Sequence, residues 1–157
     1  MIAKPSEEQI KRRSIASERH KARHYAMQGL YQWRLNSTSA TEIAEQFMID
    51  FDMKGTDKDY FIELLKGVQS GVKEIDSFLA PHIEDRDLET CDPVTLSLLR
   101  IATYELKNRI DIPYKVVINE SVNLSKKFGP AESHKFINGM LDKLAHELRA
   151  TETSSQK

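Results

Sequence analysis

The sequence predicts an all-α protein of about seven helices. Over the clearest stretches, apolar residues recur at steps of three and four, which is the spacing of one face of an α-helix. Polar residues that favour helix caps precede several of these stretches. No segment alternates strictly between polar and apolar residues over a length that would indicate a β-strand.

The first helix is expected to include the stretch from Ser17 to Trp33. A helix can begin earlier, because Ser6 and Gln9 match a capping box. At 100° per residue, one stripe of small and apolar side chains follows. It comprises Ile15, Ala22, Ala26, Gly29, Leu30 and Trp33. A group of arginines lies beside this stripe, within about 40° of one another. These are Arg12, Arg19 and Arg23.

The second and third helices follow the polar loop LNSTSAT. Ser39 and Glu42 form another capping pattern, which opens a helix that runs to about Phe51. Thr56 is the expected N-cap of the third helix, which ends before Pro81. The core face of this third helix comprises Phe61, Leu64, Leu65, Val68, Val72, Ile75 and Leu79.

The second half of the chain is expected to hold the central helix and two more. Asp92 and Pro93 stand as N-cap and first residue of the run VTLSLLRIATYELKN. Its apolar positions are dense enough to bury most of its circumference, so we expect it to be central. Another helix begins at Pro113 and closes at Gly129, and a last apolar face runs from residue 136 to 148. The tail TETSSQK is polar and expected to fray.

Composition and length bound the function. A chain of 157 residues is one domain, or two helical subdomains that share a core. Its single cysteine, Cys91, excludes an intramolecular disulfide and indicates a reducing compartment. No apolar run approaches the ~20 residues of a membrane span, and the first residues lack the apolar region of a secretory signal. We therefore expect a cytoplasmic protein.

Nothing in the pattern indicates catalysis, and we predict no enzyme activity, cofactor or metal. His20 and His24 are spaced to face one metal, but zinc sites use at least three protein ligands. The acidic neighbours of Cys91 should raise the pKa of its thiol rather than activate it. Three glycines lie inside predicted helices, where they indicate close helix packing rather than a phosphate loop. These are Gly67, Gly71 and Gly139.

Charge is distributed unevenly along the chain. Residues 1–34 hold eight Lys/Arg and three Glu, a net of +5, although the whole chain has a formal net charge of -1. The remainder therefore carries -6. A basic head on an acidic body is expected of a protein with one polyanionic and one cationic partner. The alternative is that the charge runs are merely solvated helix faces.

Clustered guanidiniums are a plausible phosphate-binding surface, and flat side chains can stack on unpaired bases. The flat candidates are His20, His24, Tyr25 and Phe136, each of which could instead be a core or idle surface residue. A second cationic region surrounds the Gly-Pro corner near residue 130. Its members are Lys126, Lys127, Ser133, His134 and Lys135, and the amino end of the helix that follows would itself attract anions.

Two stretches of the sequence resemble one known family. ARHYAMQGLYQW, and much later LLRIATYELKNRIDIPYKVVINESVNLSKKFGPAESHKFINGMLDKLA, are similar to the NusB family of bacterial transcription antitermination factors. The resemblance implies two helical bundles about a shared helix. It also implies a non-enzymatic adaptor that binds boxA RNA of nascent ribosomal transcripts together with the ribosomal protein NusE. That complex then acts in the RNA polymerase antitermination complex.

The resemblance also assigns residues. RNA contacts fall on Arg19, His20, Lys21, Arg23, Lys126, Lys127, Glu132, Ser133 and Phe136, and partner contacts on Glu84, Asp85, Asp87, Glu89 and Thr95. The sequence ERHK replaces an arginine run that is frequent in the family, so His20 would weaken RNA binding or make it pH-sensitive. Thr95 replaces a glutamate common in relatives.

Residues 1–16 are expected to be a partly flexible extension, residues 17–149 the RNA-binding domain and residues 150–157 a polar tail. Two alternatives stay open: a helical scaffold whose partner supplies most of the RNA affinity, and the isolated accessory domain of a ribosomal RNA methyltransferase. A homodimer that masks the RNA face, which the family resemblance allows, also stays open.

Overall fold

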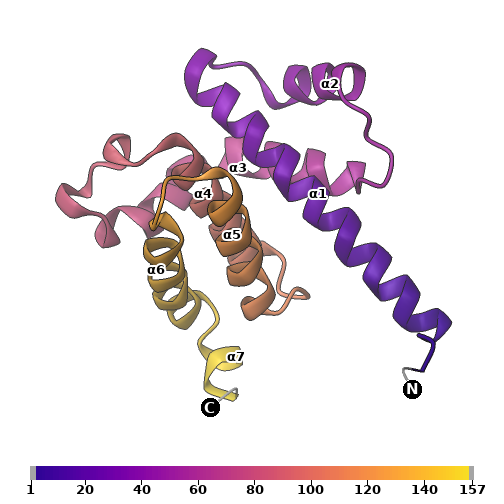
Figure 1. The fold of residues 1–157 in the computed structure, drawn as a ribbon. Coiled ribbons are helices and arrows are strands. Elements are labelled where there is room, and N and C mark those ends of the chain that lie inside the picture. Colours follow the sequence, from indigo (N-terminus) through magenta and orange to yellow (C-terminus); the bar gives the residue numbers. More distant parts are fainter. Residues whose placement is uncertain (1–2, 156–157) are drawn as a thin grey trace.

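The computed structural model describes residues 3–155, which form an all-α fold (Figure 1). The helices are α1 (Glu7–Asn36), α2 (Ala40–Asp50), α3 (Lys58–Leu79), α4 (Pro93–Asn108), α5 (Tyr114–Phe128), α6 (Ser133–Leu148) and α7 (Ala150–Ser155). Three short 3-10 turns between α3 and α4 span Ala80–His82, Glu84–Arg86 and Leu88–Thr90. No strand occurs within the described residues, as the sequence predicts.

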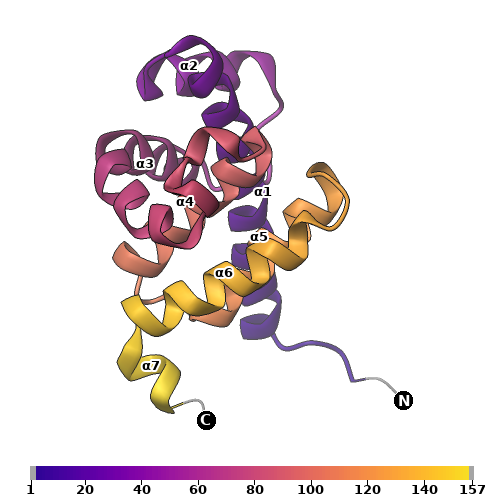
Figure 2. The ribbon, with the colours of Figure 1, turned by 90° about the vertical axis from the view of Figure 1, so that its left-hand side faces the viewer.

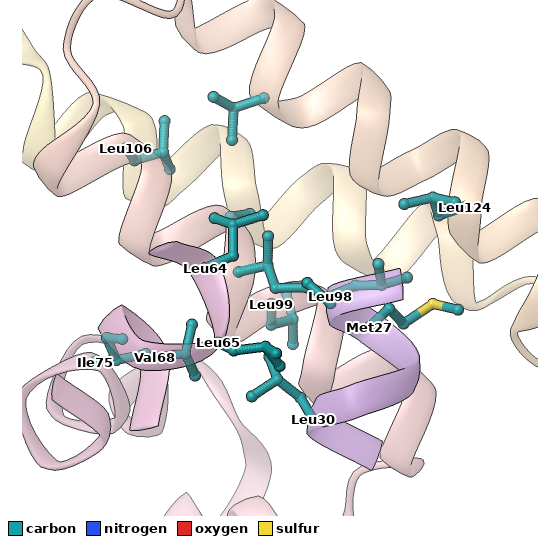
Figure 3. Close-up of a cluster of buried hydrophobic side chains, with 14 of the residues drawn as sticks. Met27, Leu30, Leu64, Leu65, Val68, Ile75, Leu98, Leu99, Leu106 and Leu124 are labelled. Carbon is teal, nitrogen blue, oxygen red and sulfur yellow. The ribbon is translucent and has the colours of Figure 1, made fainter. Parts of the chain in front are cut away.

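The central position of α4 is confirmed. It packs against α1, α3, α5 and α6, because apolar side chains cover most of its circumference. Leu98 and Leu99 of α4 meet Met27 of α1 and Leu64 of α3 in the buried cluster of Figure 3. The first bundle therefore comprises α1–α3 and the second α5–α7, with α4 shared between them (Figure 1).

Helix α1 begins at Glu7, ten residues before the domain boundary expected at residue 17. Ser6 caps it, and the capping box closes in both directions: the Gln9 amide N–H donates to the Ser6 hydroxyl at 3.1 Å and the Ser6 N–H donates to the Gln9 side chain at 2.9 Å. The helix then continues through 30 residues to Asn36. Residues 7–16 are thus the first turns of α1, with exposed side chains.

Several local details differ from the sequence prediction. Asp57, not Thr56, caps α3: its carboxylate accepts from the Tyr60 N–H at 3.0 Å, whereas Thr56 is buried in the preceding turn. Close packing holds for Gly67, because an added Cβ would lie 2.3 Å from the Tyr104 ring. It does not hold for Gly139, whose Cβ position has no neighbouring atom within 4 Å.

The described part of the segment expected to be a frayed tail forms α7, and residues 156–157 lie outside the described residues. Arg149 precedes α7, and its guanidinium donates to backbone oxygens at the end of α4: Glu105 at 2.9 Å, Leu106 at 2.8 Å and Arg109 at 2.7 Å, with Ile112 beyond. Glu152 pairs with Arg149 at 3.0 Å and accepts from the first N–H of α5 at 3.0 Å. Polar contacts hold α7 in place, so apolar periodicity gives no sign of it.

Candidate nucleic-acid interface

The two cationic regions meet where the end of α5 lies against α1. The rings of His24 and Phe128 stack with centroids 4.5 Å apart and planes 14° apart. The ammonium of Lys127 lies 5.3 Å from the same Phe128 centroid. Figure 2 shows the α5–α6 turn beside the middle of α1. Residues a hundred positions apart in the sequence are therefore neighbours here.

The electrostatics of His24 reflect this contact. Burial lowers the pKa of His24, and the charges of Lys127 and His20 lower it further. Its Nε2 atom also lies 2.7 Å from the side-chain amide nitrogen of Gln28. A histidine whose pKa is lowered stays neutral at pH 7. His24 therefore contributes a flat, uncharged ring between cations rather than a charge of its own.

Arg23 departs from the role that the family resemblance gives it. Its side chain is only 3% exposed, and its guanidinium is paired with Glu105 in two-point contact, at 3.0 Å from Nε and 2.8 Å from Nη2. The Tyr60 hydroxyl donates to the same carboxylate at 2.6 Å. Burial lowers the pKa of Arg23, but the hydrogen bond and charge of Glu105 outweigh it and raise the pKa overall. In this structure the Arg23 guanidinium is enclosed and already paired, which favours a role in holding α1 over a direct phosphate contact.

The other cations of α1 are more accessible. Lys21 is exposed and reaches over the α2–α3 loop near Gly55. Arg19 is half-buried beside the Tyr60 ring, 5.4 Å from its centroid, and its Nε has no hydrogen-bond partner among residues 3–155. His20 places Nδ1 2.5 Å from the Glu120 carboxylate. Within the described part of the chain, Arg19 and Lys21 form no salt bridge.

The start of α6 supplies an exposed ring. Phe136 is 44% exposed, one turn into the helix. Ser133 holds the corner instead of presenting a free hydroxyl: it donates to the Pro130 carbonyl at 2.8 Å and lies 2.8 Å from the Ser125 hydroxyl. Glu132 adopts a left-handed conformation (φ 71°) and pairs with Lys135 at 2.6 Å. Lys126 and Lys127 are exposed at the end of α5.

Phe128 also lines an apolar groove that the sequence reasoning missed. Its volume is about 580 Å³, and α1, α2 and the start of α4 line it. Tyr31 and Leu35 of α1 contribute, and Leu35 is 66% exposed. Phe51 and Val94 complete the apolar walls, and Asp50 adds an acidic edge. The available signal was the pair Tyr31 and Leu35, one turn apart and outside the core stripe of α1.

The expected partner residues have mixed positions. Glu84 and Asp87 are exposed on the connector between α3 and α4, and Glu89 pairs with Arg34 of α1 at 3.2 Å. The Asp85 side chain lies outside the described part of the structure. Thr95 lies in the first turn of α4, where Asp92 accepts from its N–H. It is only 4% exposed in the packed fold, so little of its side chain is presented to a partner.

The remaining candidates from the sequence are a metal site, a reactive Cys91 thiol and a membrane span. Within residues 3–155, His, Cys, Asp and Glu form no group of three or more that could hold a metal. Burial is the largest effect that raises the pKa of the Cys91 thiol, and Asp87 and Asp92 add to it. The helices in the described region are too short or too polar to cross a membrane.

The sequence was compared with family models and with proteins of known family. The NusB family model matches residues 20–146. The transcription antitermination protein NusB of Teredinibacter turnerae is 52% identical over 142 residues, which cover 90% of this chain and 97% of that protein. The protein of the same name from Marinobacter nauticus is 49% identical over 138 residues, 88% of this chain and 87% of its own length.

A solved structure extends the agreement to the fold. T. maritima NusB superposes with a TM-score of 0.73 at 29% identity, over 82% of this chain and 90% of the other. The family model covers residues 20–146, which include the α5–α6 corner and α1 from residue 20 onward, and the relatives cover most of the sequence. This chain therefore belongs to the NusB family of transcription antitermination proteins.

Proposed function

We propose that this protein is a non-enzymatic RNA-binding adaptor, which binds boxA-type sequences of nascent ribosomal RNA together with the ribosomal protein NusE. One observation carries the proposal: α1 and the end of α5 converge at the His24–Phe128 stack, with Lys127 on the same ring. Cations from two helices thus border a flat surface, and this combination suits single-stranded RNA.

The proposed division of roles follows from exposure and pairing. Arg19, Lys21, Lys126 and Lys127 would hold phosphates, because no salt bridge within the described residues neutralises them. Phe136 would stack on an unpaired base. His20 shares the Glu120 carboxylate and would lie at the edge of the RNA path. Arg23 would position α1 without contacting RNA.

The partner protein would bind in the apolar groove. Tyr31, Leu35 and Phe51 form an exposed apolar surface. Contact with water is unfavourable for such a surface, and exposed apolar patches of this kind mark sites of protein–protein interaction. Asp50 at its rim and Glu84 and Asp87 on the connector are acidic, which would complement a basic ribosomal protein. Phe128 lines this groove and also stacks on His24, so the two proposed surfaces share one side chain.

Replacing Lys127 with alanine is expected to flatten the salt dependence of RNA binding. Each phosphate contact to single-stranded nucleic acid contributes about 0.7 to the slope of log K against log salt concentration. We expect the slope of Lys127→Ala to be lower by about that amount in fluorescence anisotropy titrations with boxA RNA. Lys73→Ala removes an exposed lysine of α3 and is the matched control. Equal slopes for wild type and Lys127→Ala would contradict the assignment.

Replacing Phe136 with leucine is expected to weaken RNA binding without changing its salt slope. Stacking of a base on an aromatic ring contributes about 1–3 kcal/mol, so the dissociation constant should rise at least about fivefold. Leucine keeps the apolar contact of this half-exposed position but not the flat ring. The measurement should be repeated with NusE present. If the isolated wild-type protein does not prefer boxA RNA to scrambled RNA but does so once NusE is added, the result would favour the scaffold alternative.

A further inference from the structure

A second groove borders the proposed RNA surface at the amino-terminal half of α1. Its volume is about 430 Å³, and it lies between α1 and the segment that leads into α5, which face each other in Figure 1. Arg12, Ile15 and Arg19 line one wall, and Asp111, Pro113 and Val116 line the other. Arg12 and Ile15 precede residue 20, where the match to the family model begins.

We propose that this groove binds one nucleotide of the same RNA strand, next to the element held by α1 and α5; this inference rests on the proposed function. The groove would place the base against its apolar walls and the phosphate against Arg12 and Arg19. Its volume lies within the ~300–1,000 Å³ of small-ligand sites. Ile15 and Val116 are each 41% exposed, so apolar surface is available to a base.

The charges in the groove favour an anion although two carboxylates line it. Asp111 is engaged by Arg109 in two hydrogen bonds, at 3.0 and 3.1 Å. Glu120 lies 2.5 Å from His20 and 3.7 Å from Arg23. Arg109 is also the leading cause that holds the pKa of Asp111 below its usual value. Both carboxylates thus already have cationic or polar partners.

The arginines on the opposite wall are less committed. Arg12 pairs only with Glu8 at 2.6 Å among the described residues, and both side chains are more than 70% exposed. Such exposed pairs contribute about 0–1 kcal/mol, so a phosphate can displace the carboxylate. Arg19 lines the groove and forms no salt bridge among residues 3–155, although its Nε atom is itself buried. The groove therefore offers one exposed and one half-buried guanidinium beside an apolar wall.

The groove is also continuous with the proposed RNA surface. Arg19 belongs to both, and His20 of that surface contacts Glu120 of the groove wall. A strand that passes the Lys127 and His24 region along α1 would reach the groove next. Free nucleotide and RNA would present the same chemistry, but this continuity favours an RNA strand as the source.

The test compares RNA lengths. Anisotropy titrations should use the intact protein with three RNAs. These are a minimal boxA RNA, the same RNA with three adenosines added at its 5′ end, and the same RNA with three adenosines added at its 3′ end. We expect one extended RNA to bind at least about fivefold more tightly, the equivalent of one stacked base. Arg12→Ala and Ile15→Ser should lose this gain and bind the minimal RNA as wild type does.

Matched controls lie on the same exposed turns. Arg13→Ala and Ile10→Ser remove an exposed arginine and an exposed isoleucine outside the groove lining, and should keep the gain. Equal affinity of wild type for all three RNAs would overturn the groove proposal and leave the proposed function intact. An equal loss in Arg12→Ala and Arg13→Ala would also overturn it, in favour of diffuse attraction. Failure of every RNA to bind, with and without NusE, would overturn the proposed function itself.

Discussion

Replacement of Arg23 by methionine is expected to destabilise the fold by about 3–5 kcal/mol, because it leaves the Glu105 carboxylate buried without a cation. Among the described residues, the Tyr60 hydroxyl would then be the remaining hydrogen-bond donor to that carboxylate. Urea unfolding should show a lower midpoint with an unchanged slope. RNA binding by the folded fraction should keep its salt dependence, since Arg23 contacts no phosphate in this assignment.

The double variant Arg23→Met/Glu105→Leu separates the charge from the packing. Replacing both partners of a buried ion pair by apolar residues is frequently close to neutral, so the double variant should recover most of the lost stability. Arg13→Met, at an exposed position of the same helix, should unfold like wild type. An Arg23→Met protein with wild-type stability and a flatter RNA salt slope would show that Arg23 is an RNA contact after all.

The Arg23 pair also shows what sequence periodicity cannot supply. The pattern correctly grouped Arg19 and Arg23 on one edge of α1. It could not tell which of them faces inward, because Glu105 lies 82 positions away. In the structure, Arg19, Arg23 and Arg109 approach the Tyr60 ring to 5.4, 5.6 and 4.9 Å from its centroid. The Glu105 carboxylate, which also accepts from Tyr60, binds Arg23 and keeps it buried, whereas Arg19 stays more accessible beside the Tyr60 ring.

Local signals were more reliable than long-range ones. The capping box at Ser6, the Asp92 cap of α4 and the dense apolar pattern of α4 all depend on neighbours within a few residues, and each was predictable. The apolar groove at Tyr31 was not, because α1, α2 and the start of α4 form it together. The burial of Thr95 was missed for the same reason: it depends on how α4 packs in the whole fold.

The same limit applies to α7, whose attachment depends on one buried arginine. The last carbonyls of a helix are not all satisfied within it. Arg149 donates to those of Glu105, Leu106 and Arg109 at the end of α4. The carbonyls of Glu105 and Arg109 also accept from the backbone N–H groups of Arg109 and Ile112. The Arg149 side chain is buried, with the residue only 6% exposed, and it pairs with Glu152. Residues 149–155 are therefore held partly through backbone acceptors that no sequence motif marks.

Replacement of Arg149 by methionine is accordingly expected to cost about 3–5 kcal/mol. Hydrogen bonds to a charged donor contribute about 1.5–3 kcal/mol each. The change removes several of them, and the Leu106 carbonyl loses its side-chain donor, while the carbonyls of Glu105 and Arg109 keep backbone N–H donors. For a chain of this size the melting temperature should fall by roughly 10 °C. Lysine would not restore it, because a single ammonium has three donors and cannot span the acceptors of a planar guanidinium.

Hydrogen exchange can localise the effect of this Arg149→Met change. Amides of α7 and of the last turn of α4 should lose protection first, since Arg149 joins these segments, while α1–α3 should exchange as in wild type. Deletion of residues 150–157 is the informative control, because it removes Glu152 but leaves Arg149 on the α4 carbonyls. If the deletion destabilised the protein as much as Arg149→Met does, the contribution would belong to α7 packing. A smaller loss on deletion would assign it to the guanidinium that completes the end of the central helix.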